Sequence, residues 1–196
     1  MRRILTIALP LLLALPAPYA RALPTGVGDF HDLVQRADLI FAGTVADAQC
    51  TRVRDGIITE ITFRRLVYVK GSGPKDSLIV RRDGGTLDGM VTGSEDQPTF
   101  CVGERCVLLA RSDLGSSANL YTPFVGASAG VFRLFEDSPK KKPVVHDSHG
   151  TPVAGIEDRR LLLAVDENAG RRLSEKEFLE TLRRIVREQE KPAPPR

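Results

Sequence analysis

Residues 57–69, IITEITFRRLVYV, contain the pattern that decides the fold. Every second residue from position 57 to position 63 is suited to one buried face of a strand: Ile57, Thr59, Ile61 and Phe63. The alternation then changes phase at Arg64-Arg65-Leu66. Such a change inside a strand indicates a β-bulge or a strong bend. The segment therefore predicts a long, curved strand of the kind that wraps around a small barrel.

Four further segments are apolar enough to form strands of the same sheet. We expect these strands at residues 39–45, 77–82, 105–110 and 129–135. With residues 57–69 they make five strands, and the chain is predicted to be mainly β.

Two helices are expected to flank the strands. Residues 29–37 place apolar side chains at i, i+3, i+4 and i+7, with Asp29 as the N-cap. Ser174 and Glu177 form a capping box before an amphipathic run that we expect to be helical to about residue 189. The simplest role for both helices is to pack an apolar stripe on the strands.

The first 22 residues have the composition of a secretory signal peptide. Arg2 and Arg3 precede an apolar core over residues 4–15, and Ala20-Arg21-Ala22 offers a small-x-small cleavage pattern. The core is shorter than the roughly 20 apolar residues that a membrane span needs. We therefore expect a mature chain that starts at Leu23, is periplasmic or extracellular, and has no stable membrane insertion.

The charge of the chain argues against a nucleic-acid partner. The formal net charge of +3 equals the three arginines of residues 1–22, which contain no acidic residue, so the rest of the chain is formally neutral. A basic binding surface has no compositional support after cleavage.

The mature chain is expected to be a single domain with an appendage. The predicted boundaries are a barrel domain over 23–140, an extension packed on it over 141–173, the C-terminal helix over 174–190 and a disordered tail over 191–196.

Three cysteines follow the leader: Cys50, Cys101 and Cys106. Two of them should pair in an oxidising compartment, and three pairings are open. We favour Cys101 with Cys106, because the tetrapeptide between them is turn-like and a hairpin would place the two sulfurs on facing positions. Cys50 would then be a thiol that is buried or available to another chain.

Several of these motifs, in this order, resemble a group of uncharacterised bacterial secreted proteins. They are DLVQRADLIFAGTV (32–45), VKG (69–71), VRRDGG (80–85), FCVGERCVLLA (100–110) and YTPFVGASAGVFRL (121–134). The resemblance implies an OB-like five-stranded barrel, similar in fold to tissue inhibitors of metalloproteinases and to netrin modules. Those inhibitors chelate zinc through an N-terminal cysteine, which the predicted terminus at Leu23 lacks. The resemblance therefore carries a fold and no catalytic residue.

We expect a non-catalytic binding module with no cofactor, which contacts a protein partner, such as an exported peptidase, through its loops. Loops on a rigid scaffold commonly carry recognition. The candidate surface is the loop 83–98 with the turn 102–105, and its charged residues are Asp83, Asp88, Glu95, Asp96, Glu104 and Arg105.

The alternative is a small serine hydrolase. Residues 126–130, GASAG, match the G-x-S-x-G pattern around Ser128, and Asp147 and His149 or His146 follow it. The pattern requires a strand-to-helix turn, whereas the apolar residues after Gly130 predict a strand. His146, His149 and His31 were also considered as metal ligands, but a loop with two of them gives too few ligands in a fixed frame, so no metal is expected.

Overall fold

The structure is a computed structural model that describes residues 29–54, 56–94, 97–114, 123–136, 142–165 and 170–191. The predicted leader over residues 1–22, the predicted terminus at Leu23 and the tail from Pro192 lie outside the described residues. The described elements, in chain order, are α1 (Phe30–Arg36), β1 (Leu39–Val53), β2 (Gly56–Lys70), β3 (Leu78–Asp83), β4 (Gly85–Leu87), β5 (Met90–Thr92), β6 (Arg105–Ala110), the 3-10 turn η1 (Ala127–Gly130), β7 (Val131–Phe135), β8 (Val144–His146), β9 (Val153–Glu157), β10 (Arg160–Leu163) and α2 (Glu175–Glu190).

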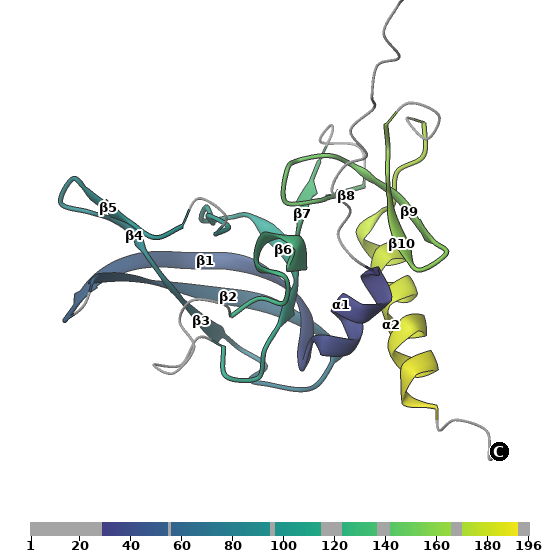
Figure 1. Cartoon of the computed structure of the whole chain (residues 1–196), viewed down its shortest axis with the longest axis horizontal. Coiled ribbons are helices and arrows are strands. Elements are labelled where there is room, and N and C mark those ends of the chain that lie inside the picture. Colours follow the sequence, from purple (N-terminus) through teal and green to yellow (C-terminus); the bar gives the residue numbers. More distant parts are fainter. Residues whose placement is uncertain are drawn as a thin grey trace, which may run out of the picture.

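The chain is mainly β, with a short N-terminal helix and a C-terminal helix, as predicted (Figure 1). Six strands form one antiparallel sheet in the order β3-β2-β1-β6-β7-β8. The two remaining pairs, β9–β10 and β4–β5, are separate two-stranded ribbons.

The prediction of a closed five-stranded barrel is wrong. The described residues form ten strands, and the six-stranded sheet is open because its edge strands β3 and β8 do not pair with each other. Other segments form backbone contacts with these edge strands instead. Arg81 N–H, on β3, donates to Leu114 O at 2.9 Å, and β8 forms isolated bridges with Ser174 and Pro152. An edge that is already covered has little to gain from closure.

The bulge predicted in residues 57–69 is confirmed. Ala42 pairs with Val67 and Thr44 with Arg64, so β2 contains one extra residue in this interval. Arg65 takes up the bulge with a φ of 53°. The extra residue explains the change of phase in the sequence, because Leu66 returns to the face that Phe63 occupies.

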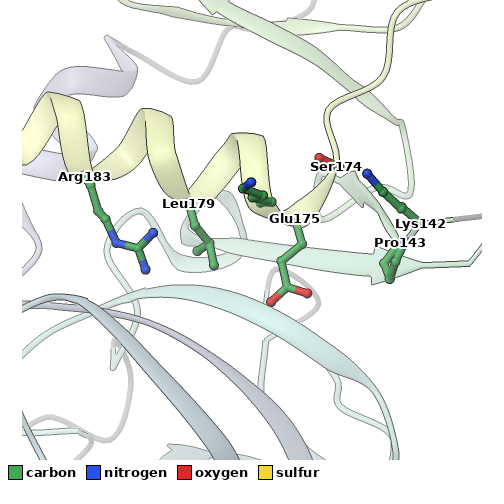
Figure 2. Close-up of a pocket in the computed structure, with 7 residues that line it drawn as sticks. Lys142, Pro143, Ser174, Glu175, Leu179 and Arg183 are labelled. Atoms are coloured by element: carbon green, nitrogen blue, oxygen red, sulfur yellow. The ribbon is translucent and has the colours of Figure 1, made fainter.

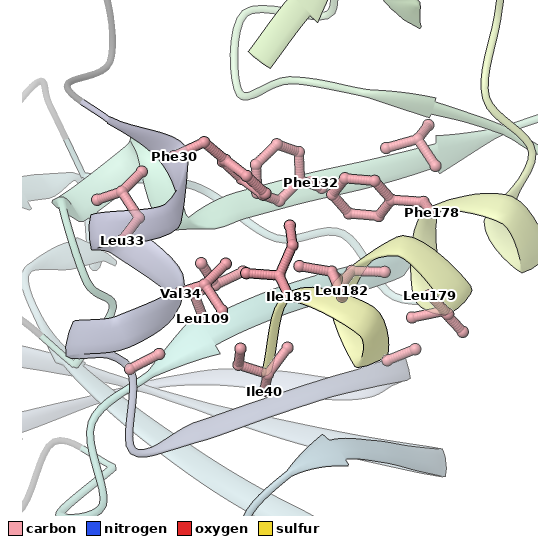
Figure 3. Packing of buried hydrophobic residues seen from close by; sticks show 14 of the residues in the cluster. Phe30, Leu33, Val34, Ile40, Leu109, Phe132, Phe178, Leu179, Leu182 and Ile185 are labelled. Atoms are coloured by element: carbon pink, nitrogen blue, oxygen red, sulfur yellow. The ribbon is translucent and has the colours of Figure 1, made fainter. Parts of the chain in front are cut away.

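The sheet has an apolar cluster on each face. On one face, α1 and α2 pack on the strands, and the rings of Phe30, Phe132 and Phe178 meet at centroid distances of 4.9 to 6.2 Å (Figure 3). On the other face, Phe41 and Phe63 stack edge-to-face at 5.6 Å under cover of the loops that carry Phe100, Leu114 and Phe124. The domain therefore has a helix-covered core and a loop-covered core.

Both predicted helices and their caps are confirmed. The Asp29 carboxylate accepts hydrogen bonds from the backbone N–H groups of His31 and Asp32 at 2.9 and 3.3 Å. Ser174 and Glu177 form the reciprocal capping box of α2. Hydrogen bonds from Ser174 hold the pKa of Glu177 below its ordinary value.

Two segments contain more regular structure than expected. The predicted loop 83–98 contains the β4–β5 ribbon, and the predicted extension 141–173 contains β8, β9 and β10. Since β8 belongs to the six-stranded sheet, the extension is in part continuous with the main body.

Candidate functional site

The predicted contact residues divide into two groups in the structure. Asp83 ends β3, and Asp88 lies in the turn of the β4–β5 ribbon, where its carboxylate is 3.7 Å from the Arg52 guanidinium. Glu95 and Asp96 lie outside the described residues. Glu104 and Arg105 belong to the body of the protein instead.

Glu104 is used internally. Its side chain is 9% exposed and forms an ion pair with Arg133, which is 16% exposed and also donates to Thr99 O at 2.8 Å. The second carboxylate oxygen of Glu104 accepts a hydrogen bond from the Cys101 backbone N–H at 3.1 Å. A carboxylate committed in this way holds the turn before β6 in place and is not free for a partner.

Arg105 is likewise a structural tie. Its Nε donates to Glu175 at 2.9 Å, and its Nη1 donates to Thr44 Oγ1 at 3.4 Å and to the Arg65 carbonyl at 3.3 Å. The side chain thereby joins β6, β1, the β2 bulge and α2. Glu104 and Arg105 are therefore engaged in contacts within the protein and are not exposed contact residues.

Part of the predicted loop 83–98 is exposed at the opposite end of the molecule from the helices, where the β4–β5 ribbon projects beside the end of the β1–β2 hairpin (Figure 1). Val91 is 75% exposed, Met90 46% and Val53 38%. The Arg52–Asp88 pair connects the two hairpins. We call these five residues the hairpin tip surface.

Glycines allow the ribbon to form and to lie against the sheet. Asp88 and Gly89 have φ values of 51° and 76°, which is typical of a tight two-residue hairpin turn. At the base, a Cβ on Gly84 would lie 2.5 Å from Thr92 O, and a Cβ on Gly85 would lie 2.6 Å from Cys50 Sγ. The sequence contains a signal for this ribbon, because Asp88-Gly89 lies between two short segments that can pair as strands. The glycines and polar residues of the whole segment nevertheless favoured a loop.

Ser128 and His149 line one small cavity. It has a volume of about 190 Å³, and Ser148, Arg133 and Thr99 also line it. Ser128 lies in η1, after Gly126 and Ala127 with φ values of 69° and 52°. The structure therefore places Ser128 and His149 beside the same cavity. The sequence alone shows only their order along the chain.

The rest of a catalytic triad is not assembled there. In the described part of the chain no hydrogen bond joins Ser128 to His149, and Asp147 Oδ1 accepts from the backbone N–H groups of His149 and Thr151 at 3.0 and 2.8 Å. His146 is buried, with its ring against Phe135 and its Nδ1 3.0 Å from the Val144 carbonyl. The segment after Gly130 is strand β7, not the helix that a nucleophile elbow requires.

All three cysteines are free in the structure. Residues 101–104 form the expected turn, closed by a hydrogen bond from Glu104 N–H to Cys101 O at 3.0 Å, but no described strand immediately precedes it, and the pairing of Cys101 with Cys106 stays a prediction. Cys106 pairs with Gly43 and Arg133 on the neighbouring strands, and Cys101 is exposed before the turn. Burial raises the pKa of the Cys106 thiol far above its ordinary value, which disfavours the thiolate form.

No cluster of three or more His, Cys, Asp or Glu side chains among the described residues lies close enough to hold a metal ion. Within the same residues, no helix has the length and hydropathy needed to cross a bilayer.

Comparisons with protein-family models, with curated proteins and with solved structures found no match for this chain. The resemblance to secreted barrel proteins therefore stays a prediction.

Proposed function

We propose that the protein is an exported, non-catalytic interaction module that contacts a protein partner through the hairpin tip surface. The observation that carries the proposal is the exposure of Val91 and Met90, consecutive residues of β5 on the two faces of a ribbon that pairs with no other strand among the described residues. Neither residue belongs to the two apolar clusters. The two side chains therefore make no contribution to either core that would explain why they are apolar.

The chemistry of the surface favours a protein partner. Three exposed aliphatic or thioether side chains, Val53, Met90 and Val91, belong to the same two hairpins as the Arg52–Asp88 pair. Apolar centres with a polar rim are typical of protein interfaces, and methionine adapts readily to a partner's surface. A strand ribbon with unpaired backbone edges can also add to an extended segment of the partner.

An exported peptidase is the partner class that we propose. A narrow ribbon that projects from a rigid sheet has the shape to enter a substrate cleft, where its backbone can pair as a substrate strand would. The proposal depends on export, which the leader over residues 1–22 supports. An intact mass that starts at Leu23 would agree with that export, and a retained leader would contradict it.

Site-specific photocrosslinking tests the contact. A photoreactive residue replaces Val91 in the full chain, and the matched control carries it at Val102, which is also exposed but precedes β6. We expect a defined adduct with an exported peptidase from position 91 only, lost when Met90→Asp is added. Protection of that peptidase from an active-site probe would place the ribbon in its cleft. Equal adducts from positions 91 and 102, or none from position 91, would contradict the proposal.

Serine hydrolysis is the second candidate function, and the shared cavity of Ser128 and His149 is the observation that favours it. A fluorophosphonate probe tests it directly. Labelling that is lost in Ser128→Ala and retained in Ser148→Ala, which lines the same cavity, would establish a reactive Ser128. No labelling of the folded chain would exclude a reactive serine of that kind.

A further inference from the structure

A second surface feature lies at the helix-covered end of the molecule. A groove of about 350 Å³ runs along the first half of α2, and Figure 2 shows Glu175, Leu179 and Arg183 directed to the same side of the helix, towards the strands beneath. These residues are four apart, so they share one face of the helix. Lys142 and Pro143 close the groove beside the N-terminus of α2, and Lys176 joins its lining.

The groove is positively charged. The carboxylate of Glu175 is already paired with Arg105. Among the described residues, neither Lys142 nor Arg183 forms an ion pair, and the contact of Lys176 with Glu180 is 3.9 Å long between two exposed side chains. Three cations therefore line the groove, and the one carboxylate among its lining residues is paired with Arg105. Glu177, in the capping box beside the groove, offsets part of the charge of Lys142.

The cations and the apolar residues follow each other along the groove. Lys142 lies near its start, Leu179 at its middle and Arg183 at its end. Lys176 is the second residue of α2 and therefore also belongs to the start. The cation positions 176 and 183 are separated by about 10.5 Å along the axis, from the helical rise of about 1.5 Å per residue, and their long side chains can extend that span by a few Å. Leu179 is nearly buried and gives the centre of the groove an apolar floor.

This spacing matches one face of an extended peptide. Side chains at i, i+2 and i+4 of a strand point the same way, and the outer two are about 13 Å apart, since each residue rises about 3.3 Å. An acidic residue at i would meet Lys142 and Lys176, an apolar residue at i+2 would meet Leu179, and an acidic residue at i+4 would meet Arg183. Arginine favours such a contact because its guanidinium can hold a carboxylate with two hydrogen bonds.

We infer that the α2 groove binds an extended acidic segment of another polypeptide, of the pattern acidic-x-apolar-x-acidic. Charge complementarity and the apolar centre together select this occupant over a fully polar anion. The groove lies at the other end of the molecule from the hairpin tip surface (Figure 1), so the inference does not depend on the proposed function.

Peptide binding to the full chain tests the inference. The probe is an end-blocked, dye-labelled Glu-Ser-Leu-Ser-Glu peptide, and binding is measured by fluorescence anisotropy at low ionic strength. Gln-Ser-Leu-Ser-Gln, Glu-Ser-Ser-Ser-Glu and the rearranged Glu-Glu-Leu-Ser-Ser serve as comparison peptides. We expect each to bind at least about fivefold more weakly than the probe, and binding of the probe to weaken as salt screens the charges.

A pair of variants assigns the binding to the groove. Arg183→Gln should weaken binding about tenfold, the loss expected for one charge-assisted hydrogen bond. Arg184→Gln removes the same charge from the exposed face of the same helix and should leave the affinity within about twofold. Saturable binding with this order of peptides and variants would support the inference. Absence of binding, equal binding of the rearranged peptide, or equal effects of the two variants would overturn it.

Discussion

The two ends of the β1–β2 hairpin differ in what surrounds them, although the same two strands run through both. At the start of β1, Ile40 and Phe41 are fully buried between the helix-covered and loop-covered cores. At its end, Arg52 and Val53 are exposed beside the β4–β5 ribbon. The difference separates stability from recognition, because one end is needed to hold the fold and the other is free to contact a partner.

Charge follows the same division. In the body of the fold, Glu104–Arg133 and Arg105–Glu175 are partly or largely buried and join elements far apart in the chain. At the hairpin tip, Arg52 and Asp88 are exposed and 3.7 Å apart. Ion pairs removed from water depend on both partners, whereas an exposed pair contributes little to stability. The predictions below test this division, from the largest expected effect to the smallest.

The strongest test is Phe178→Ala in the helix-covered core. Phe178 is fully buried and contacts the rings of Phe30 and Phe132. Removing the ring should lower the free energy of unfolding by about 3–5 kcal/mol, measured by urea denaturation. Phe178→Leu should lose clearly less, because more of the volume is retained. A loss below about 1 kcal/mol for the alanine variant would mean that α2 does not hold this core together.

The next test breaks the Glu104–Arg133 pair. Glu104→Leu leaves the largely buried guanidinium of Arg133 without its carboxylate and should cost about 3 kcal/mol. The double variant Glu104→Leu with Arg133→Met removes both charges and should recover most of that loss. If the double variant is as unstable as the single one, packing and not charge accounts for the effect, and the double-mutant cycle will show it.

A smaller effect is expected at the start of α2. Ser174→Ala removes the N-cap hydroxyl and should cost about 1 kcal/mol. The folded-state pKa of Glu177 is lowered by Ser174, so its contribution to stability is present above the ordinary glutamate pKa and is lost as the pH falls through the lowered value. Ser174→Ala should therefore reduce the fall in stability on acidification. If the stability of the original chain and that of Ser174→Ala depend on pH in the same way, this role of the capping box is contradicted.

The smallest effect on stability is expected at the hairpin tip. Val91→Asp should change the free energy of unfolding by less than about 0.5 kcal/mol, because the side chain packs against neither core. Thermal unfolding measures this. A loss of several kcal/mol would show that the ribbon supports the fold, and the division between the two ends would then be wrong.

Local features of the sequence were sufficient for much of the fold. Asp29 and the Ser174–Glu177 box mark the starts of the two helices, because an N-cap acts on N–H groups within three residues of it. The change of phase at Arg64–Leu66 located the bulge of β2, because a bulge shifts the side-chain alternation of its own strand. Among the expected strands, the central positions of β1, β2, β3, β6 and β7 were also evident from local composition.

Other features depended on residues far apart in the chain. Whether the sheet closes is decided by what reaches its edges, and Leu114, Pro152 and Ser174 do so from separate segments. The commitment of Glu104 to Arg133 could not be read from either residue alone, and neither could the shared cavity of Ser128 and His149. Two of the six residues predicted for the contact surface, Glu104 and Arg105, are thus used inside the fold.

By itself, then, the sequence determined the helices, their caps, five of the ten described strands and the bulge, since each depends on interactions within a few residues. The tertiary structure alone decided that the sheet is open, that Arg105 is bound to Glu175, seventy residues later, and that Arg183 and Lys142 line one groove. The physical reason is that hydrogen-bond periodicity is local, whereas the pairing of charges and the covering of sheet edges depend on which distant segments meet in space.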